Sequence, residues 1–178
     1  MKLHQDSLRF RLLIGTVVWI GLGIVVGGLL VSSLFRWNLL QGYHEELEIH
    51  IEELAALTAL DRTGQPYLLR RLSDPRYLPL GSGFYWQVDR AGYKTEASPS
   101  LGNKRFNPGF ASGTALHIAW ADGPSGTTLE YGKQIPLAGG PPLQLLIATD
   151  KRLVDATMAE FNRSLALSLA TFALLMIA

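Results

Sequence analysis

The chain has 178 residues, of which 48% are hydrophobic, and its 16 basic and 15 acidic residues leave a formal net charge of +1. Basic and acidic residues also nearly balance between Arg36 and Arg163, which argues against a nucleic-acid partner. The sequence contains no cysteine, which excludes a disulfide framework and thiol chemistry. The length fits one domain with additional segments, since domains most often have about 100–150 residues.

The N-terminal part contains an uncharged, apolar run from Leu12 to Phe35. As a helix it would reach about 36 Å at about 1.5 Å per residue, enough to cross a bilayer with some tilt. A buried core helix is disfavoured, because such helices rarely stay apolar on all sides over this length. A cleavable signal peptide is also disfavoured, because its apolar region has only about 7–15 residues. We therefore predict an N-terminal tip at residues 1–11 and a membrane span at residues 12–35.

The charges beside this run predict its orientation. Lys2, Arg9 and Arg11 precede the span against a single acidic residue, Asp6. Short basic flanks tend to stay in the cytoplasm. We therefore expect a cytoplasmic N-terminus, a periplasmic domain at residues 36–163 and a location in the bacterial inner membrane, with the lipid bilayer as a partner.

The C-terminal segment, residues 164–178, has the same apolar character. It carries no charge after Arg163 and ends without a helix cap. About 15 residues are too few to span a bilayer at about 1.5 Å each. Either the segment is a helix docked on a soluble core, or it is the start of a second transmembrane helix that is truncated within the membrane. We favour the second interpretation, which makes the chain the front part of a longer, multi-pass protein.

Helix-forming residues continue from Asn38 to about Leu60. Leucines recur there every seven residues, and a second set of side chains follows each leucine by three positions, as in the seam of a coiled coil. This pattern predicts a homodimer through Leu40, Leu47, His50, Leu54 and Leu57. The alternative is an amphipathic helix that lies on its own domain, with Ile51 widening the apolar face. About three heptads do not decide between the two.

The rest of the domain has the pattern of an antiparallel sheet. Tyr67–Leu72 is predicted to be a short helix. Clusters of Gly, Pro and Asp then separate short segments that are rich in strand-forming residues. The predicted strands are Phe84–Asp89, Tyr93–Glu96, Ala115–Trp120, Thr127–Ile135 and Leu143–Thr149. A helix follows Asp150 and runs into the final apolar segment. The predicted fold class is therefore α+β, with two transmembrane helices beside the domain.

The first predicted strand, Phe84–Asp89, lies in a segment where three aromatic residues stand side by side. Alternation places Phe84 and Trp86 on one face of the strand and Tyr85 and Gln87 on the other. The first pair is suited to a core. Tyr85 and Gln87 carry polar groups and are the candidates for a ligand-binding face.

Two glycines in the first apolar run, Gly23 and Gly27, form a small-xxx-small pair. Such a pair allows membrane helices to approach closely, so both residues are candidates for transmembrane packing. The alternative is simple tolerance of glycine within a span.

No motif in this sequence indicates an active site. There is no P-loop, no GxSxG and no HExxH. His44 and His50 are six residues apart on the predicted helix, about 120° from alignment, so the histidines do not predict a metal site. An acidic band at residues 45–53 would suit a divalent-cation or cationic-peptide sensor, but a solvated helix face is the better interpretation. We predict no catalytic, cofactor or metal ligands in this chain.

Several sequence segments taken together resemble a known family. They are the basic tip with its apolar run, Leu72-Ser-Asp-Pro-Arg-Tyr77, Pro79-Leu-Gly-Ser-Gly-Phe-Tyr-Trp-Gln-Val88 and Ile147-Ala-Thr-Asp-Lys-Arg-Leu153. In this order they resemble the sensor half of membrane histidine kinases of two-component systems. The most specific parts of this resemblance are the Ser-Gly-x-Tyr-Trp-Gln motif and the Asp-Pro-Arg motif that precedes it.

The resemblance implies a PAS-like periplasmic domain between two spans, homodimerisation and a kinase domain beyond Ala178. It also implies ATP and Mg²⁺ as cofactors of that domain and a response regulator as its partner. No histidine in this chain matches the phosphoacceptor motif, so the catalytic residues are expected outside it. The alternatives are the sensor region of a chemotaxis receptor or cyclase, and a membrane-anchored binding protein without a signalling output.

Overall fold

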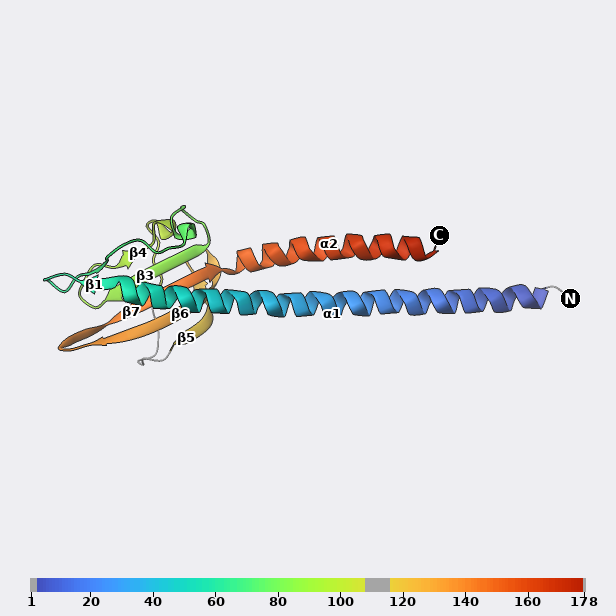
Figure 1. Ribbon diagram of the computed structural model, residues 1–178, viewed down its shortest axis with the longest axis horizontal. Coiled ribbons are helices and arrows are strands. Elements are labelled where there is room, and N and C mark those ends of the chain that lie inside the picture. Colours follow the sequence, from blue (N-terminus) through green and yellow to red (C-terminus); the bar gives the residue numbers. More distant parts are fainter. Residues whose placement is uncertain (1–2, 108–115, 178) are drawn as a thin grey trace. The chain divides into compact units, whose positions relative to one another are not determined.

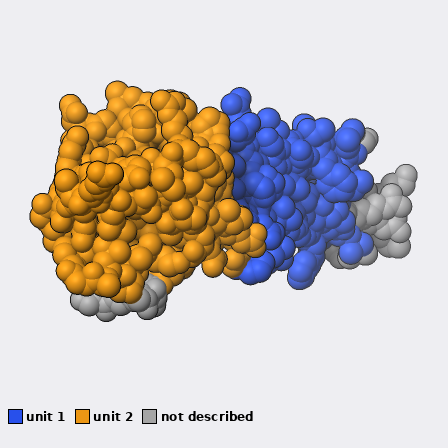
Figure 2. All heavy atoms as spheres, turned by 60° about the vertical axis from the view of Figure 1, so that its left-hand side comes forward, with its two compact units in different colours: residues 1–40, 156–178 blue, residues 41–155 orange. Residues whose placement is uncertain are grey.

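The computed structural model describes residues 3–107 and 116–177. Within the chain there are two compact units (Figure 2). Met1–Leu40 and Ala156–Ala178 form the first, which we call the helical unit, and Gln41–Asp155 form the second, which we call the sheet domain.

One helix, α1, runs from Leu3 to Leu57 without interruption (Figure 1). The predicted span and the predicted helix after it are both parts of α1. Its apolar part is exposed, and its mean hydropathy reaches 2.3 over the best window. Among the described residues, the stretch Phe10–Leu57 is the one helix long and apolar enough to cross a membrane.

The second helix, α2, runs from Lys151 to Ile177 and begins directly after the last strand. It packs on α1 within the helical unit. The rings of Phe35 and Phe161 are stacked with their centroids 3.8 Å apart. A Cβ atom added at Gly28 would lie 2.9 Å from Leu169 Cδ1, so this glycine allows the close approach of the two helices.

The sheet domain is built on a five-stranded antiparallel sheet with the order β4-β3-β7-β6-β5 (Figure 1). The strands are β3 (Phe84–Arg90), β4 (Glu96–Ala97), β5 (His117–Gly123), β6 (Gly126–Leu137) and β7 (Gly140–Asp150). The predicted α+β class, with a long N-terminal helix and an antiparallel sheet, is confirmed. The strand predicted at Tyr93–Glu96 is shorter and later than expected, and Ala115 of another predicted strand lies outside the described residues.

A short hairpin connects α1 to the sheet. Its strands are β1 (Thr58–Leu60) and β2 (Pro66–Leu68), so the helix ends three residues before the predicted boundary at Leu60. The Asp61 carboxylate accepts hydrogen bonds from the backbone N–H groups of Thr63 and Gln65, at 2.8 and 2.9 Å, and so fixes the turn. The predicted helix at Tyr67–Leu72 is wrong, because its first two residues belong to β2.

The core has two layers, one on each face of the sheet. On one face lies the end of α1, whose side chains Leu47, Ile51 and Leu54 are 0% exposed. On the other face the segment 98–107, which includes the short helix η2 (Pro99–Leu101), covers a smaller cluster around Tyr85. The domain therefore folds around the end of the helix that carries the apolar span.

Candidate functional site

The predicted ligand face of β3 is covered by the protein itself. Gln87 is 1% exposed, and its side chain holds the backbone of Phe106 at two points. Gln87 Nε2 donates to Phe106 O at 3.0 Å, and the Phe106 N–H donates to Gln87 Oε1 at 2.9 Å. A side chain with both ends of its amide engaged within the core is not available to a ligand in this structure.

Tyr85 is 1% exposed and packs against the ring of Phe106. Its hydroxyl lies 3.2 Å from both Ser125 Oγ and Asp150 Oδ2. Burial raises the pKa of Tyr85, and the Asp150 carboxylate adds to this effect, so the phenol stays protonated. Tyr85 therefore stabilises the domain and, like Gln87, does not form an open ligand face.

The predicted dimer seam is largely used within one chain. Leu47 and Leu54 are 0% exposed, Leu57 is 9% exposed, and all three belong to the core between α1 and the sheet. Their burial matches the alternative interpretation, an amphipathic helix that lies on its own domain. A dimer contact through these three leucines would require displacing the sheet. His50 is half-buried and faces the segment that follows β2, and Leu40 belongs to the helical unit.

The predicted packing glycines, Gly23 and Gly27, are not the point of close approach to α2. A Cβ atom added at either position would meet no described atom of α2 within 4 Å. The close approach of the two helices occurs instead at Gly28, one residue further along α1. Packing of Gly23 and Gly27 against another molecule stays a prediction.

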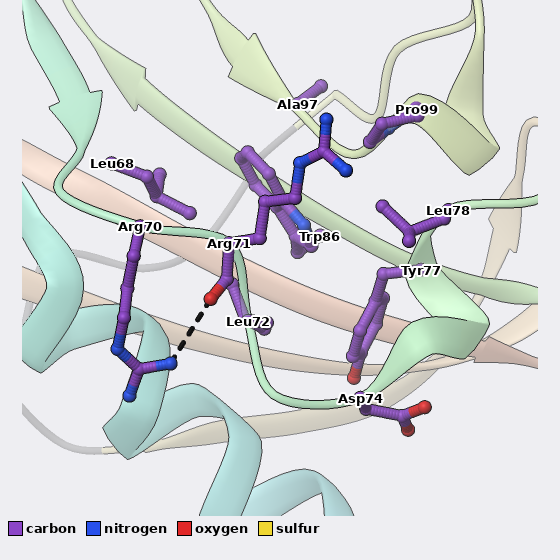
Figure 3. A pocket seen from close by; sticks show the side chains of 10 residues that line it. All are labelled: Leu68, Arg70, Arg71, Leu72, Asp74, Tyr77, Leu78, Trp86, Ala97 and Pro99. Carbon is purple, nitrogen blue, oxygen red and sulfur yellow. Dashed lines mark hydrogen bonds between the residues drawn. The ribbon is translucent and has the colours of Figure 1, made fainter.

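A cavity of about 330 Å³ lies beside the segment that follows β2 (Figure 3). Its walls come from β2, β3 and β4, from the segment between β2 and β3, and from the start of η2. The lining residues are Leu68, Arg70, Arg71, Leu72, Asp74, Tyr77, Leu78, Trp86, Ala97 and Pro99. The cavity is near the lower end of the size range for small-molecule sites, which is about 300–1,000 Å³.

The two arginines of this cavity point in different directions (Figure 3). Arg70 turns toward α1, where its Nη1 lies 3.3 Å from Glu53 Oε1. Arg71 points away from Arg70 and lines the cavity together with Trp86. Among the described residues its guanidinium has no ion-pair partner. A cavity lined by a guanidinium together with apolar and aromatic side chains suits a small ligand with an apolar body and a negative group.

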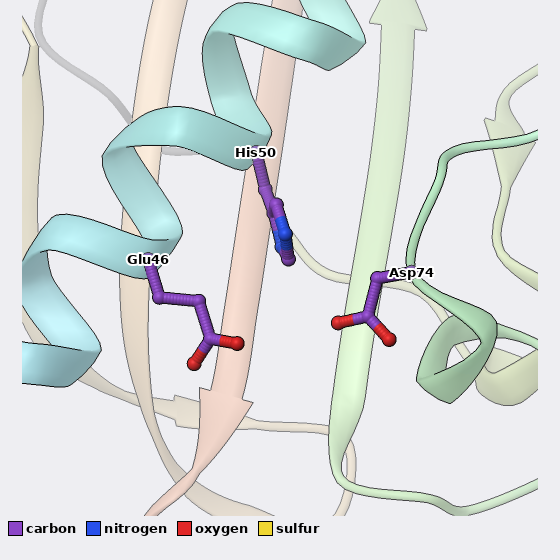
Figure 4. A group of neighbouring side chains, drawn as sticks. All are labelled: Glu46, His50 and Asp74. Atoms are coloured by element: carbon purple, nitrogen blue, oxygen red, sulfur yellow. The ribbon is translucent and has the colours of Figure 1, made fainter.

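Next to the cavity, three potential metal ligands converge (Figure 4). Glu46 and His50 are four residues apart on α1 and therefore share one face of the helix. Asp74 precedes the short helix η1 (Pro75–Tyr77), and its carboxylate accepts the Arg76 N–H at 2.8 Å. One ligand atom from each of the three residues lies within 4.8 Å of the other two.

Arg76 is the ion-pair partner of both carboxylates of this cluster. Its Nη2 is ion-paired with Glu46 Oε1 and lies 2.5 Å from Asp74 Oδ2. Its guanidinium carbon lies 4.0 Å from the centroid of the Phe84 ring, a cation–π contact. Arg76 thus connects α1, η1 and β3.

Tyr77 holds the imidazole of the same cluster. Its hydroxyl lies 2.8 Å from His50 Nδ1, and the side chain is 1% exposed. Burial raises the pKa of Tyr77, and the nearby Asp74 carboxylate raises it further, while Arg76 acts in the opposite direction. The phenol is therefore protonated at all physiological pH values and acts as a fixed hydrogen-bond partner of His50.

The sequence contained one signal for this cluster that our interpretation missed. Glu46, His50 and Glu53 recur at helical spacing and lie on one face of α1, which contacts the segment 70–77. The Glu53 carboxylate also accepts hydrogen bonds from the Ser73 N–H at 3.0 Å and the Ser73 hydroxyl at 2.8 Å. Asp74 is distant in sequence, and no local pattern could have placed it beside His50.

Comparison with models of protein families, with curated proteins and with solved structures found no match to this chain.

Proposed function

We propose that this chain is the sensor and transmembrane region of a membrane receptor that responds to a stimulus outside the cytoplasm. One observation carries the proposal. The single helix α1 combines an exposed apolar part, long enough to cross a membrane, with a final part that is buried in the core of the sheet domain. No flexible linker separates the two parts.

This continuity supports a role in signal transmission. An α-helix is a stiff element, so a shift or rotation of its end in the domain also moves the apolar part. A ligand needs only different affinities for two arrangements of the domain to change their populations. The core leucines of α1 and its contacts with the segment 70–77 are the points where such a change would act on the helix.

The second connection to the helical unit supports the same proposal. Strand β7 ends at Asp150, and α2 begins at Lys151. Asp150 is 1% exposed, and its backbone N–H donates to Gly83 O at 2.8 Å. The start of α2 is therefore also fixed to the sheet, so a change in the sheet domain would act on both helices.

The finer parts of the proposal come from the resemblance to sensor histidine kinases. They are a PAS-like periplasmic domain, a second span in α2, a homodimer in the bacterial inner membrane and a kinase domain that uses ATP and Mg²⁺ to signal to a response regulator. The alternative is a membrane-anchored binding protein. It would have the same fold, but its sheet domain would transmit no signal through the helices.

The absence of cysteine makes the topology directly testable. Leu80→Cys places a thiol at a position that is 78% exposed in the sheet domain, and Ser7→Cys places one in the N-terminal tip. A maleimide that cannot cross the inner membrane should label Leu80→Cys in intact cells and Ser7→Cys only after lysis. Labelling of Leu80→Cys only after lysis would refute an exported sensor domain.

The proposed kinase output can be tested by sequencing the reading frame beyond Ala178. A helix with a phosphoacceptor histidine followed by an ATP-binding domain would support the kinase. A reading frame without these parts would contradict it, and the topology experiment would then still decide whether the sheet domain is exported.

A further inference from the structure

The cluster next to the cavity has a composition that its ion pairs do not explain. Arg76 is paired with the carboxylates of Glu46 and Asp74, yet a ring nitrogen of His50 also lies within 4.8 Å of an oxygen atom of each of them (Figure 4). Two carboxylates and one imidazole form the mixed oxygen and nitrogen set that binds Zn²⁺ and similar transition metals. Mg²⁺ and Ca²⁺ prefer oxygen ligands alone.

We propose that Glu46, His50 and Asp74 form a binding site for a divalent transition metal of the Zn²⁺ class, for which Arg76 is the competing cation. Three protein ligands leave one position for water, unlike structural zinc sites, in which the protein supplies all four ligands. The proposal goes beyond the absence of metal ligands expected from the sequence.

The charges and the exposure of Arg76 make this exchange feasible. Glu46, Asp74 and Arg76 together carry a net charge of −1, whereas the two carboxylates with a divalent cation in place of Arg76 carry none. The side chains of Arg76 and Glu46 are 42% and 32% exposed. The side chain of Asp74 is 9% exposed, so a metal has to replace one partly buried ion pair as well as the exposed pair with Glu46. In exchange it gains three ligands, one from each residue of the cluster.

The surroundings of His50 fit the role of a ligand. Histidines that bind metals almost always have the other ring nitrogen held by a hydrogen-bond partner, which fixes the orientation of the ring. Here the Tyr77 hydroxyl lies 2.8 Å from His50 Nδ1, and Tyr77 is itself fixed in the core. The imidazole is therefore already oriented before any metal binds.

The consequence for signalling rests on the function proposed above. Two of the ligands, Glu46 and His50, belong to α1, and the third, Asp74, belongs to the segment before η1. Metal binding would replace the ion pairs of Arg76 with direct coordination between α1 and this segment. The metal would thereby act on the part of α1 that also carries the core residues Leu47 and Ile51.

The test is isothermal titration of the full-length chain in detergent micelles with ZnCl₂, with MgCl₂ as the control salt. We expect one Zn²⁺ per chain and no comparable heat with Mg²⁺. His50→Gln and Asp74→Asn should each weaken Zn²⁺ binding by at least about tenfold, because each removes a ligand. Arg76→Gln should tighten it by about fivefold or more, because it removes the cation that competes for both carboxylates.

His44 provides a matched control on the same helix. His44 Nδ1 is also hydrogen-bonded to a tyrosine hydroxyl, that of Tyr131, but His44 is not part of the described ligand cluster. His44→Gln should leave Zn²⁺ affinity unchanged within about twofold. Circular dichroism checks that each variant is folded, and Arg76→Gln keeps the test decisive because it predicts a gain.

Zn²⁺ binding that is unchanged by His50→Gln, or weakened by Arg76→Gln, would overturn the proposal, as would an equal loss with His44→Gln. These measurements need no signalling output. A failure of the metal site is therefore distinguishable from a failure of the proposed sensor function, which the labelling experiment tests separately.

Discussion

Gln87 offers a sharp test of how the sheet domain is held together. The substitution Gln87→Leu keeps a side chain of similar size in a position that is 1% exposed, but removes both ends of the amide. The N–H and C=O groups of Phe106 then lose the partners that lie at 2.9 and 3.0 Å. Each buried backbone group left without a partner costs about 1–3 kcal/mol.

The gain from burying an apolar side chain offsets part of this loss. With two unpaired groups and an offset of about 1 kcal/mol, we expect the free energy of unfolding to fall by about 3 kcal/mol. Urea denaturation of the full-length chain in detergent, followed by tryptophan fluorescence, measures this change. Hydrogen exchange at the Phe106 amide should accelerate in parallel, because the segment 98–107 loses its anchor.

Gln65 is the matched control, because it makes the same two-point contact at the surface. Gln65 Nε2 donates to Lys94 O at 2.7 Å, and the Lys94 N–H donates to Gln65 Oε1 at 3.0 Å. Water can replace these exposed bonds, so Gln65→Leu should cost less than about 1 kcal/mol. Equal costs for the two substitutions would refute the argument that burial of the Gln87 contact is what stabilises the segment 98–107.

Three further predictions concern the core, a buried carboxyl group and the helical unit. Leu54→Ala should lower the free energy of unfolding by about 2–5 kcal/mol in the same urea titration, because Leu54 is 0% exposed. Burial raises the pKa of Glu130, so the native state holds this proton to higher pH than the unfolded chain does, and stability should fall as pH rises above about 4.5. Glu130→Gln should flatten this part of a stability profile against pH and stabilise the protein at pH 7. Gly28→Leu should weaken disulfide cross-linking between cysteines introduced beside the α1–α2 contact, because a side chain at Gly28 would meet Leu169 of α2, whereas Gly23→Leu should not, because a Cβ atom at Gly23 meets no described atom of α2 within 4 Å.

The sequence predicted those elements whose patterns are local. Alternation located β3, and the strand-forming runs at Thr127–Ile135 and Leu143–Thr149 lie within β6 and β7. The end of α1 was missed, because Thr58-Ala59-Leu60 has no helix-breaking residue and adopts a strand only by pairing with β2. The helical preference of these three residues is weak, so their pairing with β2 determines where α1 ends.

The candidate site was less predictable for the same reason. The sequence shows that Glu46 and His50 are four positions apart on a helix. Their third partner, Asp74, is distant in sequence and is brought close to them only when the chain folds. Alternation also could not show that both faces of β3 are covered. Gln87 looked like a ligand-binding residue because its partner, the backbone of Phe106, has no signature in the sequence.

Strand β3 links the two helices that leave the sheet domain. Phe84 and Tyr85 are neighbours in sequence and therefore point to opposite faces of the sheet. On one face the Phe84 ring lies beneath the guanidinium of Arg76, which is ion-paired with Glu46 on α1. On the other, the Tyr85 hydroxyl lies 3.2 Å from Asp150 Oδ2, directly before α2. A rearrangement at Arg76 therefore has a path of direct contacts, through two adjacent residues of one strand, from α1 to the start of α2.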